Sequence, residues 1–354
     1  MTILRVQGVT LPDEVERQFF IDDGVIREDP VPNAETVAEG MWLVPGLVDM
    51  HTHPGVEAAG APFDDELFGR QVRSQRDAGV LTIRCPGLAA YLPDRLRPVS
   101  PRIIAAGPWL AATDGFFQGW GQQMAVQDLP AAAEAQAQRA DGWCKVVLDW
   151  LMTDDDGRRY RPTVPPDVLV EIVRRVHAIG GRVATHTQHG DGAAAAVEAG
   201  VDSIEHGMHL SEDLLDRMAA QGTALVPTLL AFSTTPDVVR AETEPDRFSR
   251  FKLAGWARHP ALARAAWDAG VTVLAGTDGL PHGNIVAEVD QLIAAGLPGS
   301  DALGAASWIA LDYLGIPFFT DGARADVVAY RDDPRIGDGY RHPDRIIAAG
   351  EVLA

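Results

Sequence analysis

The sequence contains little cysteine and relatively few basic residues. Its 354 residues include two cysteines, Cys85 and Cys144, which exclude a disulfide framework and suit a reducing compartment. The 30 basic residues are outnumbered by 50 acidic ones, so the formal net charge is -20. Such a field repels phosphate backbones and anionic membrane surfaces. We therefore expect no nucleic-acid partner and no lipid-surface partner.

The sequence also lacks a long apolar run. The longest uncharged stretch, Met218–Pro236, contains Gln221, Gly222 and Pro227, and it is too polar and too broken to cross a membrane. The first residues, Met1–Arg5, lack the charged and then apolar pattern of a secretory signal. We expect a cytoplasmic protein that acts on a small-molecule substrate.

What the chain does have is a regular alternation of helical and apolar segments. The phrases Asp77–Val80, Glu198–Val201 and Asp268–Val271 each end a helical stretch at a glycine and open an apolar run, which is typical of a helix that leads into a buried parallel strand. Eight such strands alternating with helices predict an α/β fold, a (β/α)8 TIM-like barrel. The predicted strands are Val44–His51, Val80–Arg84, Arg102–Ala106, Cys144–Leu148, Arg182–His186, Asp202–Glu205, Ala224–Thr228 and Thr272–Gly276.

The two ends of the chain have a different pattern. Residues 1–43 contain short alternating runs joined by an Asp22–Gly24 turn, and residues 322–354 contain similar runs. Separate β-rich ends that flank a barrel can pair with each other. We therefore predict two domains, a small β-sandwich built from residues 1–43 plus 322–354 and a barrel over residues 44–321.

Four of the ten histidines lie where a predicted strand ends. His51 and His53 close the first strand, and residues two apart on a strand share a face, so both imidazoles can reach one metal ion. His186 closes the fifth strand, His206 closes the sixth, and Asp278 follows the eighth. In this fold the chemistry takes place at the carboxyl ends of the strands. The pattern predicts that these five side chains converge as metal ligands.

A sixth candidate ligand is Lys145, in the apolar fourth strand. Burial disfavours the charged form of lysine, so a lysine in such a strand is rare unless it is paired or functional. A neutral amine can react with carbon dioxide to form a carbamate, an anion whose two oxygens can bridge two metal ions. The alternative is a lysine that points into the barrel and pairs with a carboxylate. Beside the other five candidates, the bridging interpretation is favoured.

Three segments carry a resemblance to a known family. Pro45–His53 resembles the first-strand motif of the amidohydrolase superfamily. Ala199–Gly207 resembles the sixth-strand motif of its imidazolonepropionase-like and Xaa-Pro dipeptidase-like group, and the 20 positions between His186 and His206 are typical of that group. Gly276–Gly279 resembles the eighth-strand segment. The resemblance covers nearly the whole chain.

This resemblance implies a binuclear metal centre. Zinc is the expected ion, with manganese, cobalt and iron as alternatives. The two ions would generate a bridging hydroxide, which Asp278 would orient and whose proton it would carry to the leaving amine. The implied ligands are His51, His53 and Asp278 for the more buried ion, His186 and His206 for the outer ion, and a carboxylated Lys145 as the bridge.

Candidate substrate contacts come from the loops that follow the strands. Relatives in the group often carry a second histidine two residues after the one that ends the fifth strand, where this chain has Gln188 followed by His189. Arg84 could bind a substrate carboxylate with both terminal nitrogens, or form a structural ion pair. Aromatic residues in the third-strand loop suit an apolar or aromatic substrate. The candidates are His282, Arg84, Gln188, His189, Phe117 and Trp120, and the alternative for each is an ordinary structural role.

Together these features favour a metal-dependent hydrolase that cleaves a carbon–nitrogen amide bond in a dipeptide, an N-acyl amino acid or a cyclic amide. A lactone, carbamate or phosphotriester hydrolase at the same centre is the main alternative. A mononuclear deaminase and a catalytically silent homologue are less favoured, the latter because all six candidate ligands are present. Relatives commonly self-associate, so a homo-oligomer is a further expectation.

Overall fold

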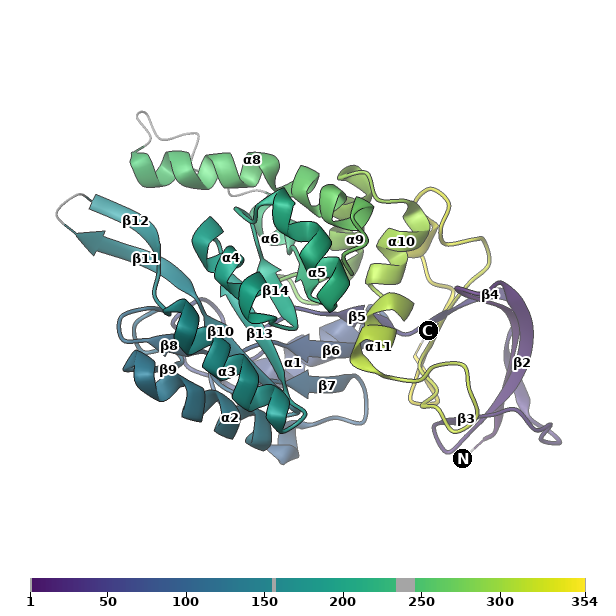
Figure 1. The fold of residues 1–354 in the computed structure, drawn as a ribbon. Coiled ribbons are helices and arrows are strands. Elements are labelled where there is room, and N and C mark those ends of the chain that lie inside the picture. The colour runs from purple at the N-terminus through teal and green to yellow at the C-terminus, as the bar shows by residue number, and fades with distance from the viewer. Residues whose placement is uncertain (1, 155–156, 234–245, 354) are drawn as a thin grey trace.

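Both ends of the chain meet in one sheet. The structure, a computed structural model, describes residues 2–154, 157–233 and 246–353. Seven strands pair in the order β18-β17-β16-β4-β1-β2-β3, and this sheet lies at one side of the molecule, near both termini (Figure 1). C-terminal β16 joins N-terminal β4 in antiparallel register. The strands are β1 (Leu4–Thr10), β2 (Val15–Asp22), β3 (Val25–Arg27), β4 (Glu35–Pro45), β16 (Val327–Tyr330), β17 (Arg345–Ala348) and β18 (Glu351–Val352).

The middle of the chain contains two parallel sheets and one hairpin. One sheet has the order β5-β6-β7 and the other the order β15-β14-β13-β10-β8-β9. β11 and β12 form an antiparallel hairpin that extends away from these sheets (Figure 1). The bounds are β5 (Leu47–Asp49), β6 (Val80–Cys85), β7 (Arg102–Ala105), β8 (Leu110–Ala112), β9 (Gln122–Met124), β10 (Trp143–Val147), β11 (Asp149–Asp154), β12 (Gly157–Pro162), β13 (Arg182–Thr187), β14 (Ser203–His206) and β15 (Ala224–Val226).

Helices pack against the parallel strands and bury their apolar stripes there. In α3, Leu169, Ile172, Val173 and Val176 recur at helical spacing and are all buried. Short 3₁₀ helices lie at Asp94–Leu96, Val126–Asp128, Glu212–Leu214 and Gly339–Arg341. The α-helices are α1 (Asp65–Asp77), α2 (Leu129–Arg139), α3 (Pro166–Ala178), α4 (Gly190–Ala199), α5 (Leu215–Gln221), α6 (Leu229–Ser233), α8 (Arg247–Asp268), α9 (Ile285–Ala294), α10 (Gly299–Ala305) and α11 (Trp308–Leu314).

The third predicted strand, Arg102–Ala106, is present as β7 and is followed by a short additional strand. β7 ends at Ala105, and the chain forms a further strand, β8, which the sequence pattern did not predict. Pro108 lies between them and has no N–H to donate, so a continuous ladder is interrupted there. β7 consequently pairs with β6, whereas β8 pairs with β10.

The eighth predicted strand is less regular than its apolar sequence indicates. Residues 272–276 form a single parallel bridge to β15. The N–H of Ala275 donates to the carbonyl of Ala305 (2.9 Å), because the end of α10 lies beside this segment. The N–H of Met50 still donates to the carbonyl of Ala275 at 2.9 Å. The first and eighth segments therefore contact each other without forming a regular ladder.

The fold is α/β, with parallel strands and packed helices, as the alternating pattern predicted. Closure of the strands into a full barrel stays a prediction, and so does a second layer that would make the terminal sheet a sandwich. No helix within the described ranges is both long and apolar enough to cross a membrane.

Candidate functional site

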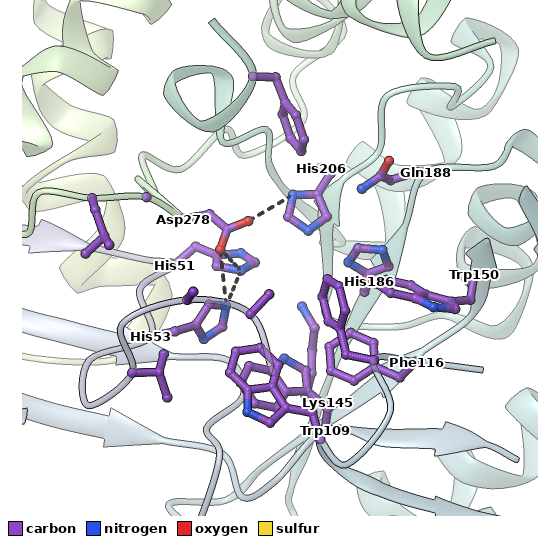
Figure 2. Close-up of a pocket in the computed structure, with 18 of the residues that line it drawn as sticks. His51, His53, Trp109, Phe116, Lys145, Trp150, His186, Gln188, His206 and Asp278 are labelled. Atoms are coloured by element: carbon purple, nitrogen blue, oxygen red, sulfur yellow. Dashed lines mark hydrogen bonds and ion pairs between the residues drawn. The ribbon is translucent and has the colours of Figure 1, made fainter. Parts of the chain in front are cut away.

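Three predicted ligands meet beside the end of β5. His51 and His53 follow this strand, and Asp278 follows the eighth segment (Figure 2). The Nε2 atoms of the two histidines are 3.0 Å apart. Asp278 Oδ1 lies 3.5 Å from Nε2 of His51 and 3.3 Å from Nε2 of His53. Imidazole and carboxylate ligands this close could hold one divalent metal ion.

The backbone of the eighth segment allows this close approach. The N–H of Asp278 donates to the carbonyl of His51 (2.7 Å), and Asp278 has a φ of 43°, a left-handed conformation that residues with a side chain rarely adopt. Gly276 has no Cβ, and one built there would lie 2.6 Å from Cβ of His51. A strained residue among convergent side chains points to a functional site.

A second pair of histidines faces the first group. His186 is the penultimate residue of β13 and His206 is the last residue of β14, and their ring centroids are 4.7 Å apart (Figure 2). Nδ1 of His206 lies 3.9 Å from Oδ2 of Asp278. Nε2 of His186 is buried and has no hydrogen-bond partner in the described part of the chain. This pair could hold a second ion next to the first.

Hydrogen bonds fix which ring nitrogen of His51 and which ring nitrogen of His53 faces the site. Nδ1 of His53 lies 2.6 Å from the carbonyl of Gly87, which can only accept, so this nitrogen carries the proton. Nδ1 of His51 donates in the same way to Oε2 of Glu205 at 2.7 Å. Both Nε2 atoms therefore present a lone pair toward Asp278, which is the arrangement that metal-binding histidines need.

The ring of His206 is oriented by a hydroxyl group. Thr228 Oγ1 donates to the carbonyl of Pro227 (2.7 Å), so it accepts the proton of His206 Nδ1 at 2.8 Å. His206 has a φ of 67°, another left-handed conformation. Its Nε2 is thereby also the unprotonated nitrogen.

Burial keeps His51, His186 and His206 neutral. Removal from water lowers the pKa of His51 to about 4 and that of His186 to about 3, and it lowers the pKa of His206 as well. Because neutral imidazole is the form that coordinates a metal, these three rings are ready to bind one at neutral pH.

Lys145 lies at the floor of the same cavity. It points from β10 into the space between His53 and His186 (Figure 2). Its Nζ is buried and has no hydrogen-bond partner among the described residues. Burial lowers the pKa of Lys145 to about 8, so roughly a tenth of the amine is neutral at pH 7, far more than for an exposed lysine. This buried amine without a hydrogen-bond partner lies between the two sets of candidate ligands.

Glu205 is a residue of this site that sequence reasoning missed. Besides His51, it accepts a hydrogen bond from Ser203 Oγ (2.6 Å) and pairs with the guanidinium of Arg84. Burial raises the pKa of Glu205, but Arg84, Lys145 and His51 together outweigh it, and the carboxyl group stays ionised. The sequence did contain a signal for Glu205. Ser203 and Glu205 are two residues apart on β14, so they share a face of this strand, the inward one.

The structure places Arg84 away from the substrate side. Arg84 is buried, pairs with Glu205, and has its guanidinium carbon 4.6 Å from the ring centroid of Trp143. It is not among the described residues that line the cavity. The geometry matches the alternative interpretation of Arg84, a structural ion pair.

The remaining predicted contacts divide into two groups. Gln188, Phe117, Trp120 and His282 line the cavity. His189 does not line it in the described structure, because it caps α4, where its Nδ1 accepts from a backbone N–H. At this position after the fifth strand, Gln188 presents its amide to the cavity.

A buried carboxylate holds the Gln188 loop in place. Asp149 accepts hydrogen bonds from Thr187 Oγ1 (2.6 Å), from the N–H of Gln188 (2.9 Å) and from the N–H of His189 (3.1 Å). Burial raises the pKa of Asp149 to about 7. Sequence analysis did not single out this residue, which positions the loop without lining the cavity.

All six predicted metal ligands line one cavity of about 370 Å³. Aromatic side chains form much of its remaining wall, and the loop at residues 57–59 and Leu280 complete the rim. The aromatic members are Trp109, Phe116, Phe117, Trp120, Trp150, Tyr160 and Phe232.

The loop that orients His206 is anchored by a second buried carboxylate. Glu288, on α9, accepts from the N–H groups of Leu229 (2.9 Å) and Leu230 (2.7 Å), directly after Thr228. Burial raises the pKa of Glu288 to about 8. A group with a raised pKa in the folded state binds its proton more tightly there, so this carboxyl group destabilises the fold progressively as pH rises from about 4 to about 8.

Glu288→Gln removes this ionisation and should make the protein's stability less sensitive to pH. Each unit of pKa difference corresponds to about 1.4 kcal/mol. The difference in free energy of unfolding, variant minus unsubstituted protein, should be larger at pH 8 than at pH 5. We expect it to increase by at least about 1.4 kcal/mol. Urea unfolding of the chelator-treated proteins at both pH values measures it, with the exposed Glu212→Gln as control. The same difference at both pH values would contradict the assignment.

Comparison with known sequences places this site in a family. Residues 42–353 match the model of the amidohydrolase family. An uncharacterized protein of Mycobacterium tuberculosis is 39% identical over 360 residues, which are 99% of this chain and 95% of that protein. Ochratoxinase of Aspergillus niger is 27% identical over 250 residues, which are 66% of this chain and 48% of that protein. The chain belongs to the amidohydrolase family.

Solved structures share the fold. A Xaa-Pro dipeptidase with bound methionine has a TM-score of 0.83 at 22% identity, and the match covers 99% of both chains. Ochratoxinase of Aspergillus niger has a TM-score of 0.80 at 20% identity, covering 99% of this chain and 95% of that one. Family membership makes the protein a hydrolase that acts on carbon–nitrogen bonds.

Proposed function

We propose that this protein is a binuclear metal-dependent hydrolase that uses water to cleave the amide bond of a small substrate. The observation that carries the proposal is the convergence of four histidines, one aspartate and one partnerless lysine in a single cavity. Ordinary packing does not account for a buried amine and a buried imidazole nitrogen that both lack hydrogen-bond partners.

Two divalent ions, zinc in the first instance, fit these side chains. The neutral amine of Lys145 would add to carbon dioxide and release a proton, which gives an N6-carboxylated lysine with two oxygens for bridging. Bound ions of this kind lower the pKa of water toward neutrality and polarise a carbonyl oxygen. The ligands would be His51, His53 and Asp278 for one ion, His186 and His206 for the other, and Lys145 for both.

Asp278 is the residue placed to move the proton. Burial would raise the pKa of Asp278, but the neighbouring histidines hold it at about 2, so the carboxylate is ionised and free to accept a proton. Its Oδ2 faces His206 and its Oδ1 faces His51 and His53, so it borders both halves of the site. It would take a proton from the attacking water and deliver it to the leaving nitrogen.

The substrates to test first are dipeptides, N-acyl amino acids and cyclic amides. The likeness in fold to a Xaa-Pro dipeptidase supports including dipeptides. The buried, partnerless Lys145 favours a bridged two-metal site over the single-metal site of a deaminase.

Chelation tests the proposal. Protein grown with zinc and bicarbonate should hydrolyse at least one member of a panel of these amides, with lactones included for comparison. Treatment with a chelator followed by desalting should abolish hydrolysis, and adding zinc with bicarbonate should restore it. Hydrolysis that survives complete removal of metal would overturn the proposal.

We also propose that the domains follow the predicted division, with a closed barrel over residues 44–321 and a β-sandwich from residues 1–43 plus 322–354. Backbone bonds from Met50 to Ala275 and from Leu274 to Leu225 support closure of the barrel. The pairing of β16 with β4 supports a shared terminal domain.

A further inference from the structure

An unbroken series of aromatic contacts connects His53, in the first group of ligands, with His186, in the second. The ring of Trp109 lies 5.0 Å from that of His53, and the ring of Trp150 lies 5.6 Å from that of His186. Phe116 connects the two, at 5.4 Å from Trp109 and 4.8 Å from Trp150. Figure 2 shows these rings on the Lys145 side of the cavity. Any substrate that places its scissile bond between the two histidine pairs must lie against this aromatic wall.

The rings of the wall are closely packed. Trp120 stacks on Trp109 at a centroid distance of 4.5 Å and an angle of 19°, and its Nε1 donates to the carbonyl of Ala61 at 2.7 Å. A Cβ at Gly87 would lie 2.4 Å from Nε1 of Trp109, so the indole packs directly on the backbone there. A surface that is already ordered loses little conformational entropy when a ligand binds.

Two rings of the wall form an open corner. Phe117 is 40% exposed although it is a large apolar residue, and its ring meets that of Trp150 at 4.7 Å and 74°. A planar ligand ring in such a corner can stack on one ring and present its edge to the other, and these are the two arrangements that aromatic pairs prefer. The corner is therefore suited to a flat aromatic group.

Apart from the proposed metal ions, the charged side chains that line the cavity favour a neutral substrate over an anionic one. The described lining contains two carboxylates, Glu57 and Asp278, and its one lysine or arginine is Lys145, which the metal site uses. Arg84 is held by Glu205 behind the site. The net charge of -20 adds a field that repels anions. Among the described lining residues, a free carboxylate on the substrate would find no guanidinium partner.

We propose that the substrate is an uncharged amide that carries an aromatic ring next to its scissile carbonyl, with the ring held in the corner between Phe117 and Trp150. This rests on the proposed hydrolase function and narrows it to neutral arylalkanoyl amides. Dipeptides and N-acyl amino acids with a free carboxylate are then poorer substrates.

Three matched compounds test the proposal on the zinc-loaded protein. Phenylacetylglycinamide has the ring and no charge, cyclohexylacetylglycinamide replaces the flat ring with a saturated one, and phenylacetylglycine adds a carboxylate. We expect kcat/KM for the first to exceed that for the second by about 10-fold, the gain from stacking on two rings. It should also exceed that for phenylacetylglycine, whose carboxylate has no guanidinium partner among the described lining residues. Phe117→Leu should reduce the ratio of the first to the second by at least about threefold. Phe318→Leu, outside the cavity, should leave this ratio unchanged.

The failure of this inference can be told apart from failure of the hydrolase proposal. Equal cleavage of the cyclohexyl compound, or faster cleavage of the carboxylate, would overturn the substrate class and leave the hydrolase in place. If no compound is cleaved, quenching of tryptophan fluorescence decides. Tighter binding of the neutral phenyl compound than of the other two would support the aromatic corner without amide hydrolysis, and equal binding would overturn it.

Discussion

Replacing Asp278 with asparagine should lower kcat by at least about 100-fold, because proton transfer by a positioned side chain contributes roughly 10²–10⁴-fold and asparagine cannot take up the proton. The amide oxygen is still able to coordinate a metal ion, and its size matches that of the carboxylate. The fold should therefore stay intact by circular dichroism. The measurement is kcat on the best amide found, together with the metal content of the variant.

A matched control separates this effect from a general loss of charge. Asp312→Asn removes a carboxylate from an exposed position on α11, away from the cavity, and should leave kcat unchanged. Retention of more than about a tenth of the activity in Asp278→Asn would exclude Asp278 as the proton carrier. The loss would then be smaller than about 10-fold, which is less than the smallest contribution expected of such a group.

Replacing Lys145 with alanine should remove the bridge and with it one metal equivalent per chain. The cavity that the side chain leaves can admit a small carboxylate in place of the carbamate. A short carboxylic acid such as propionate should therefore restore part of the metal content and part of the activity. Unchanged metal content in the variant would contradict the carbamate bridge.

The composition of the chain makes the carbamate itself easy to assign. The sequence contains two lysines, Lys145 and Lys252. Protein prepared in ¹³C-bicarbonate should show one carbamate signal by NMR. The signal should persist in Lys252→Arg, where Lys145 is the one remaining lysine, and disappear in Lys145→Ala. A signal that is lost in Lys252→Arg would place the modification elsewhere.

The positions of the candidate ligands could be predicted because they depend on local order along the chain. A strand that ends in His51 and His53 sends both side chains to one face, and parallel strands bring their carboxyl ends together. His186, His206 and Asp278 follow from the same rule. The structure brings these side chains into one cavity, while their binding of metal stays a prediction.

The residues that orient the ligands were harder to predict because their roles depend on contacts between distant segments. Glu205 is adjacent to His206 in sequence, yet it serves His51, which lies 154 positions away. Glu288 acts on the Thr228 loop from a separate helix. A single sequence reveals which residues are unusual for a buried strand, but it does not reveal which distant partner they contact.

One predicted strand is irregular and one short strand was not predicted, for a similar reason. The apolar run at residues 272–276 has the composition of a strand, but the end of α10 takes one of its backbone hydrogen bonds. β8 is three residues long and lies after Pro108, so the apolar pattern there is too short to distinguish from a loop.

The most direct test of the central claim is the amount of metal per chain, measured by elemental analysis on protein grown with zinc and bicarbonate. The account predicts close to two equivalents, held by the four histidines, Asp278 and carboxylated Lys145. Close to one equivalent would contradict the bridged centre, assign Lys145 a structural role, and make single-metal deamination the reaction to test next.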